Sequence, residues 1–332
     1  MMMVRLNVRC AVSVISLACA VCLVWLIVPG AWGQLRTSPP TARLGTGNVQ
    51  AVSYSPDGSL IAVGENSGIW LRDAHDSHAV ARSHGATGLV RALTFTPGGR
   101  LLSAGADGVV RLWDVPSMQE RRQFVGLQDQ AHAVVATPDG TTVAAAGLSD
   151  AEGICMWDVA TGTVLRRLSG AAPLSMSPDG RCLAASGVLP NTISLYDPSS
   201  GSAVGTLDGL ASRAFSLAFS PGGRLLASGE GSGQVRVWDV EARQQIGLLS
   251  EHRAPVQAVA FAPDGSSMAC GDRLGELVVW DYATGASVSL SGSETAASKP
   301  SRLRQMGVLS LPVTATARLC AGTWKRTCGN AC

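Results

Sequence analysis

The sequence has few charged and few aromatic residues, and this scarcity limits what the protein can do. Charged residues make up 15% of the chain and aromatic residues 5%, while the net charge is +2. Lysine occurs only as Lys299 and Lys325. No cluster of basic residues stands in the central part of the chain, and nucleic-acid binding rests on such clusters. The composition therefore gives no indication of a nucleic-acid partner.

The sequence also lacks the short motifs that mark common catalytic sites. It contains no Gly-x-Ser-x-Gly turn, no His-Glu-x-x-His motif and no glycine-rich phosphate loop. One string, AHDSHAV at residues 74–80, has the look of a metal site, but we interpret it as a polar turn between two strands. The sequence thus predicts a protein that is not an enzyme and holds no metal or cofactor.

In place of catalytic motifs, the chain carries a turn that returns about every 41 residues. The turn is Pro-Asp-Gly or Pro-Gly-Gly, and its spacings are 41, 41, 40, 43 and 42 residues. The six turns begin at Pro56, Pro97, Pro138, Pro178, Pro221 and Pro263. In these turns, Pro presets φ, Asp accepts a local hydrogen bond and Gly takes positive φ.

Each turn is followed by a short apolar run and then by an aromatic residue and Asp. These steps are Trp113-Asp114, Trp157-Asp158, Tyr196-Asp197, Trp238-Asp239 and Trp280-Asp281. The first copy has Arg72 before Asp73 instead. Four strands in a unit of about 40 residues are typical of a β-propeller blade.

The segment LLSAGADGVVRLWDV, residues 101–115, shows how one unit is built. Residues 101–104 are apolar and small, as in a buried strand, and Asp107-Gly108 is a strong signal for a hairpin turn. Residues 109–113 then alternate, which predicts a second strand. Because a lone hairpin is marginal in water, it must belong to a larger sheet.

The repeats resemble those of the WD40-repeat β-propeller family over residues 41–292. The resemblance rests on the six turns, the five aromatic-Asp steps and the set His84, Ser103, Asp107 and Trp113. It implies that this set is a structural tetrad, in which the four side chains are hydrogen-bonded within one blade. It also implies an all-β, WD40-type propeller that binds protein partners.

Only blade two carries all four residues of that tetrad. Blade five has Ser228 and Ser232 at the Ser and Asp positions, and blade six has Cys270 and Leu274. We therefore expect degenerate blades, some less firmly held together than blade two.

The number of blades depends on what the two ends of the chain form. Six repeats occupy residues 47–292, and residues 293–306 read as a polar linker. The tail, 307–332, resembles the first two strands of a further blade whose last strands are missing. We expect seven blades, the seventh incomplete, with a strand from residues 34–46 closing the ring. Six closed blades followed by a disordered tail are the alternative.

The first 33 residues differ in kind from the repeats. Residues 10–28 contain no charge, Arg5 and Arg9 precede them, and small residues precede Gln34 as at a cleavage site. This pattern predicts a secretory signal peptide or, because the run is long, an uncleaved membrane anchor. Either one places the propeller outside the cytoplasm. We expect membrane contact only through this segment, and only if it is uncleaved.

The cysteines of the mature chain fall into two groups. Cys155, Cys182 and Cys270 lie on predicted strands and are expected to be small core residues. The tail holds Cys320, Cys328 and Cys332, for which free thiols, a disulfide and, less readily, a zinc site all stay open.

Because no catalytic motif is present, the loops are the part of the fold where we expect binding residues. On the family pattern, partners dock on the face that carries the loops between strands two and three and between blades. We expect six binding residues there: Arg213, Arg253, Arg273, Glu152, Glu230 and Asn66. The three arginines are favoured, because Arg is common at binding hot spots.

The predicted function is that of a non-enzymatic protein-binding scaffold in the cell envelope or outside the cell. Two alternatives stay open. One is an extracytoplasmic propeller enzyme of hydrolase or lactonase type, which needs acids or histidines converging in the channel. The other is a truncated member without activity.

Overall fold

The computed structural model describes residues 49–83, 89–149, 153–282 and 284–291. The predictions made for the leader, for residues 34–46, for the linker and for the tail lie outside these ranges. Across the described residues the secondary structure is entirely β, arranged as six antiparallel sheets of four strands each. Within the same ranges, no helix is long and apolar enough to cross a membrane.

Each sheet is built from four consecutive strands, which confirms the predicted blades. In chain order the strands are β1 (Val49–Tyr54), β2 (Leu60–Glu65), β3 (Gly68–Asp73), β4 (Ala79–Arg82), β5 (Val90–Phe95), β6 (Leu101–Gly105), β7 (Val110–Asp114), β8 (Gln119–Phe124), β9 (Ala133–Ala136), β10 (Thr142–Ala146), β11 (Ile154–Asp158), β12 (Val164–Leu168), β13 (Ala171–Met176), β14 (Leu183–Ser186), β15 (Thr192–Tyr196), β16 (Ala203–Asp208), β17 (Ala214–Phe219), β18 (Leu225–Glu230), β19 (Val235–Asp239), β20 (Gln244–Leu249), β21 (Val256–Phe261), β22 (Met268–Asp272), β23 (Glu276–Asp281) and β24 (Ala286–Ser291).

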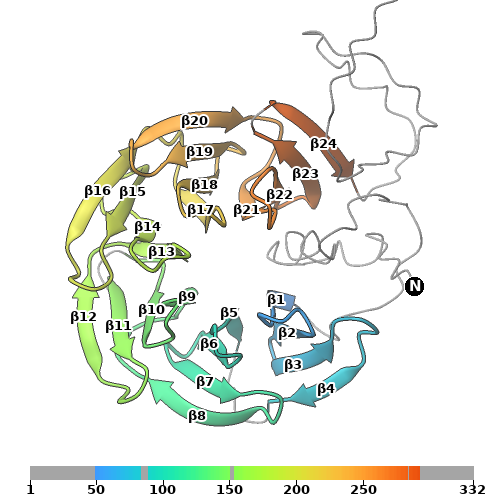
Figure 1. The fold of residues 1–332 in the computed structure, drawn as a ribbon, viewed down its shortest axis with the longest axis vertical. Coiled ribbons are helices and arrows are strands. Elements are labelled where there is room, and N and C mark those ends of the chain that lie inside the picture. Colours follow the sequence, from blue (N-terminus) through green and yellow to red (C-terminus); the bar gives the residue numbers. More distant parts are fainter. Residues whose placement is uncertain (1–48, 84–88, 150–152, 283, 292–332) are drawn as a thin grey trace, which may run out of the picture.

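The blades follow one another around a centre, with the first strand of each blade innermost and the fourth outermost (Figure 1). The innermost strands of successive blades pack side by side from β1 through β5, β9, β13 and β17 to β21. No packing of similar extent joins β21 to β1 among the described residues. The six described blades therefore form an arc that is open between blade six and blade one (Figure 1). The seventh blade, expected at residues 307–332, stays a prediction.

The hydrophobic core lies between the blades. One cluster joins Leu112 of blade two to Trp157 of blade three, and another joins Leu71 of blade one to Trp113 of blade two. The aromatic residue of the aromatic-Asp step packs against the preceding blade, because alternate residues of a strand face opposite sides of the sheet. Blade one, which has no preceding blade among the described residues, carries Arg72 at this position.

The recurring turns have the predicted chemistry. Asp57 Oδ1 accepts a hydrogen bond from Ser59 N at 3.1 Å and another from the Ser55 hydroxyl at 2.5 Å. Gly58 has φ of 72°, which L side chains rarely adopt. These hydrogen bonds, the Ser55 hydroxyl first, lower the pKa of Asp57 from 3.8 to about 2. The repeated acids are therefore turn residues, as the sequence predicted.

Candidate interaction face and the buried acids behind it

We define the upper face as the side that carries the connections between blades and the loops between the second and third strands of each blade. Arg213 lies on this face, in the connection between blades four and five, and is exposed. Its guanidinium donates to Leu148 O at 2.9 Å and to Ala172 O at 3.1 Å. These acceptors belong to blades three and four, so Arg213 ties three blades together while part of it stays accessible.

A β-bulge places Phe215 on the upper face. The register of β17 against β18 shifts between Ala214 and Ser216, which leaves Phe215 without a paired residue on the neighbouring strand. Such a bulge re-aims a side chain, and the Phe215 side chain is 46% exposed. A Cβ on Gly231 would lie 2.8 Å from the ring, so the ring covers the loop after β18. The sequence alone did not indicate Phe215, because an alternating run does not reveal a bulge.

Further apolar side chains stand exposed in the loops of the same face. They are Leu148 (52% exposed), Val188 (51%), Leu189 (65%) and Leu274 (69%). All four belong to the loops between strands two and three of blades three, four and six. With Phe215 they make the upper face of blades three to six less polar than the sequence suggested.

The six predicted binding residues do not share one environment. Arg213, Arg253, Arg273 and Asn66 are exposed on the upper face, as expected for their loops. Glu152 lies outside the described residues. Glu230 is fully buried, with 0% exposure, so it offers no carboxylate to a partner in this structure.

Glu230 is held inside blade five by a complete set of donors. Its carboxylate forms an ion pair with Arg236, whose side chain is 9% exposed. It also accepts the backbone N–H groups of Ala211 at 2.8 Å and Ser212 at 3.2 Å. A buried charge is tolerated only with such partners. Glu230 thereby fastens the connection between blades four and five to the hairpin of β18 and β19.

Blades one and six carry buried acids at the position that Glu230 occupies in blade five. Glu65 ends β2 and Asp272 ends β22, as Glu230 ends β18, and their exposures are 1% and 0%. The family pattern places the tetrad acid two residues further on, where blade five has Ser232 and blade six has Leu274. In blades five and six an acid stands instead at the end of the second strand. The sequence indicates it by a Gly-Glu or Gly-Asp pair at that point.

Blade two shows part of the predicted tetrad. Trp113 Nε1 donates to Ser103 Oγ at 2.8 Å, so the buried indole N–H has its partner. Asp107 forms an ion pair with Arg111 at 2.7 Å and accepts Val109 N. Burial alone would raise the pKa of Asp107, but these bonds outweigh it and hold the pKa below its usual value. The fourth member, His84, lies outside the described residues.

The other blades satisfy the aromatic residue in different ways. Trp238 Nε1 donates to Ser228 Oγ at 3.0 Å, which repeats the arrangement of blade two. Trp157 Nε1 donates to Val125 O at 3.0 Å, and Tyr196 Oη donates to Ser169 O at 2.7 Å. In blades three and four the degeneracy seen in the sequence is therefore compensated by backbone acceptors.

Blade six brings His252, Cys270 and Asp272 together. His252 Nε2 lies 3.2 Å from Cys270 Sγ, and His252 Nδ1 lies 3.5 Å from Asp272 Oδ2. The side chains of His252 and Asp272 are both 0% exposed. Cys270 thus stands where blade two has Ser103, and Asp272 replaces the acid that the sequence analysis did not find.

The interior cysteines match their prediction in part, because Cys155 lies on β11 and Cys270 on β22, whereas Cys182 comes just before β14. Cys155 and Cys270 are buried, Cys182 is half-buried, and all three are free. Burial raises the pKa of the Cys155 thiol and raises that of Cys182 to about 11. Cys320, Cys328 and Cys332 lie outside the described residues.

The string at residues 74–80 forms the predicted polar turn between β3 and β4. Asp73 accepts the N–H groups of His75 and Asp76, and Asp76 pairs with His78. Asp73, Asp76 and His78 could together reach one cation, but Asp76 and His78 are exposed and their polar atoms are paired within the turn. We therefore interpret this cluster as a surface turn and not as a metal site.

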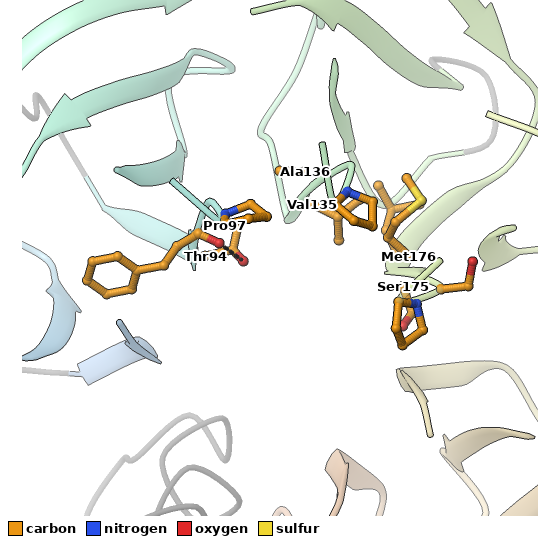
Figure 2. A pocket seen from close by; sticks show the side chains of 11 residues that line it. Thr94, Pro97, Val135, Ala136, Ser175 and Met176 are labelled. Atoms are coloured by element: carbon orange, nitrogen blue, oxygen red, sulfur yellow. Dashed lines mark hydrogen bonds between the residues drawn. The ribbon is translucent and has the colours of Figure 1, made fainter. Parts of the chain in front are cut away.

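A hollow of about 400 Å³ opens beside the innermost strands of blades two to four. Figure 2 shows its lining, with Thr94 and Pro97 on one side and Val135, Ser175 and Met176 on the other. None of its lining residues carries an acid, a histidine or a cysteine.

Comparison with known families gives one result that agrees with this geometry. A model of the WD domain, G-beta repeat (WD40), matches residues 77–114, 201–239 and 243–281. Each match begins at or beside the outermost strand of one blade and ends with the third strand of the next. The chain therefore carries WD40 repeats at three positions, and its six four-stranded blades are consistent with a WD40 propeller.

A search of curated proteins gave no match. The repeats themselves define the class: a WD40 propeller suggests a protein–protein interaction scaffold, and such domains typically bind protein partners. The family is generally non-enzymatic.

Proposed function

We propose that this protein is a non-enzymatic scaffold that binds a protein partner through the upper face of blades three to six. The observation that carries the proposal is the exposed Phe215 beside the exposed Arg213. Aromatic residues and arginine are enriched among the few residues that dominate binding energy. Loops on a rigid scaffold are also where binding residues concentrate.

The surroundings of these two residues suit a protein partner. Leu148, Leu189 and Leu274 add apolar area on the same face, while Arg253 and Arg273 add positive charge in the loops beside and within blade six. Interfaces of this kind combine an apolar centre with a polar rim. The partner surface we expect is therefore apolar with acidic residues at its border.

The hollow near the centre gives no support to a propeller enzyme. A hydrolase or lactonase needs acids or histidines that converge on a substrate, and the lining of this hollow consists of apolar, proline and hydroxyl side chains. The inactive, truncated alternative predicts no partner at all, so a binding experiment separates it from the scaffold.

We place this scaffold in the cell envelope or outside the cell. The support is the charge-free run at residues 10–28, preceded by Arg5 and Arg9 and followed by small residues before Gln34. Mass spectrometry of the mature N-terminus tests it. A first residue of Gln34 indicates cleavage and an intact N-terminus indicates an anchor, whereas a full-length chain in the cytoplasmic fraction contradicts export.

The docking experiment compares tagged full-length protein with two variants after crosslinking in cells. Phe215→Ser removes the exposed ring from the upper face. Ile246→Ser removes a side chain of similar exposure, 53%, from β20 on the outer rim. We expect a partner recovered with wild type and with Ile246→Ser, but reduced about 30-fold with Phe215→Ser, since a hot spot contributes about 2 kcal/mol or more.

Two outcomes contradict the proposal. A partner that binds Phe215→Ser as well as wild type would place docking elsewhere. Equal recovery of background proteins by all three forms would favour the inactive alternative.

A further inference from the structure

Two arginines reach blade three at the inner border of the upper face. Arg91, at the start of β5, donates to Gln130 Oε1 at 2.9 Å, in the connection that leads into blade three. Arg213, just before β17, donates to Leu148 O at 2.9 Å, just after β10. One guanidinium group therefore approaches blade three from blade two, and the other approaches it across blade four.

The imidazole of His132 lies near both guanidinium groups. The backbone N–H of His132 donates to Ala146 O at 2.9 Å, which places this residue beside the end of β10. Burial lowers the pKa of His132, and the positive charges of Arg91 and Arg213 lower it further. The opposing charge of Asp129 does not offset them. Two positive charges therefore act on one neutral imidazole.

The innermost strands carry these side chains at equivalent positions. The register of β5 against β6 shifts between Val90 and Ala92, which leaves Arg91 without a paired residue, as the bulge in β17 leaves Phe215. Arg91, His132 and Phe215 each stand six residues before the proline of the recurring turn in their blade. They therefore lie at the upper ends of the innermost strands of blades two, three and five (Figure 1).

The charges of the two arginines are not neutralised within the described part of the chain. Arg111 and Arg236 form ion pairs with acids, whereas Arg91 and Arg213 donate there only to uncharged oxygens, each from one terminal nitrogen. Among the same residues, Arg91 Nε is buried without a hydrogen-bond partner. A buried donor of a charged group is costly when it has no acceptor. The two groups thus offer positive charge and unused donors, which a carboxylate complements.

We propose that Arg91 and Arg213 bind a carboxylate of the protein partner, from an Asp or Glu side chain that enters at the inner border of the upper face. The inference rests on the proposed function, since it names the chemistry that the same face recognises. The exposed side chains of Leu148 and Phe215 stand beside Arg213, so the acid we expect is flanked by apolar residues.

The test measures the binding of two capped peptides to full-length protein by isothermal titration calorimetry. Acetyl-Leu-Glu-Leu-amide carries one carboxylate between two apolar side chains, and acetyl-Leu-Gln-Leu-amide has the same shape without the charge. Arg91→Gln and Arg213→Gln each remove one guanidinium group. Arg181→Gln is the matched control, because it removes an exposed arginine from the turn between β13 and β14, on the opposite face.

We expect wild type and Arg181→Gln to bind the Glu peptide about 10-fold more tightly than the Gln peptide, as the gain of one charge-assisted hydrogen bond implies. Arg91→Gln and Arg213→Gln should lose most of this preference. In NMR spectra of histidine-labelled protein, the Glu peptide should raise the pKa of His132, because a negative charge offsets the two guanidinium groups. The Gln peptide should leave it unchanged.

Three results would overturn the inference. They are equal affinity of wild type for the two peptides, no binding of either peptide, and a preference for the Glu peptide that both arginine variants keep.

Recovery of the partner by crosslinking separates this failure from failure of the proposed function. If Phe215→Ser loses the partner and Arg91→Gln retains it, the scaffold stands and the carboxylate site is wrong. If Phe215→Ser retains the partner, the proposed docking face is wrong whatever the peptides show.

Discussion

Blades five and six place an acid at the same point of the same fold and satisfy it in different ways. In blade five, Glu230 meets Arg236, so the chain supplies the positive charge itself. In blade six, the position of Arg236 is taken by Val278, and Asp272 meets His252 at 3.5 Å with an oxygen left unpaired. The two blades have the same strand order, and their second and third strands pair in the same register.

The acid, and not its partner, is therefore the feature that these blades have in common. A carboxylate at the end of the second strand can receive backbone N–H groups from the neighbouring loop, which explains its place. The remaining negative charge then needs a partner, and blade five uses the Arg236 guanidinium where blade six places the His252 imidazole.

The largest expected effect comes from removing the cation of blade five. Arg236→Met leaves Glu230 buried without its ion pair, and such a change costs about 3–5 kcal/mol of unfolding free energy. Urea unfolding followed by tryptophan fluorescence measures the loss. The double variant Glu230→Gln with Arg236→Met should recover most of it, because Gln keeps an acceptor for Ala211 and Ser212 without a charge.

If Arg236→Met alone unfolds at the same urea concentration as wild type, the ion pair of Glu230 and Arg236 contributes nothing to stability. Blade five would then not depend on its arginine. A double variant no more stable than the single one would show that packing of the arginine, and not its charge, was lost.

The next effect concerns the histidine of blade six. His252→Ala leaves the buried Asp272 carboxylate without the imidazole that lies 3.5 Å away, and a buried acceptor left without its partner costs about 1–3 kcal/mol. Differential scanning calorimetry should therefore show a lower melting temperature for His252→Ala than for wild type. Equal melting temperatures would show that the imidazole does not support the acid.

A smaller effect tests the indole anchors that blades two and five share. Ser228→Ala deprives Trp238 Nε1 of its acceptor inside the protein, which costs about 1–3 kcal/mol for a buried donor left unsatisfied. Ser103→Ala should cost a similar amount in blade two. Chemical denaturation of the two variants checks this, and a loss in only one of them would show that the two blades are not equivalent.

The smallest effect contrasts an exposed acid with the buried ones. The pKa of Asp57 is lowered to about 2 in the folded state, so its hydrogen bonds stabilise the protein above pH 3.8 and are lost as the pH falls toward 2. Wild type should therefore be more stable than Asp57→Asn at pH 5, with the difference shrinking toward pH 2. Urea midpoints across this range measure it, and a difference independent of pH would contradict the assignment.

The sequence predicts the blades well because their signals are local. A Pro-Asp-Gly turn, an alternating run and an aromatic-Asp step each depend on a few neighbouring residues, and the strands lie where these signals place them. The pairing of Trp113 with Ser103 was also predictable, since both belong to one hairpin and match the family pattern.

The site was less predictable because it depends on register and on approach between distant segments. Phe215 reaches the surface through a bulge, and Glu230 is buried because Arg236 and the connection at Ala211 converge on it. The residue types alone predict neither the bulge nor the approach of these distant segments. The same holds for His252, which meets Asp272 only when the connection between blades folds over the hairpin.

The most direct test is a crystal structure of the full-length protein. We predict that the Arg236 guanidinium contacts Glu230 in blade five, and that the His252 imidazole lies between Cys270 and Asp272 in blade six. A structure in which Glu230 or Asp272 faces solvent would contradict the comparison of the two blades.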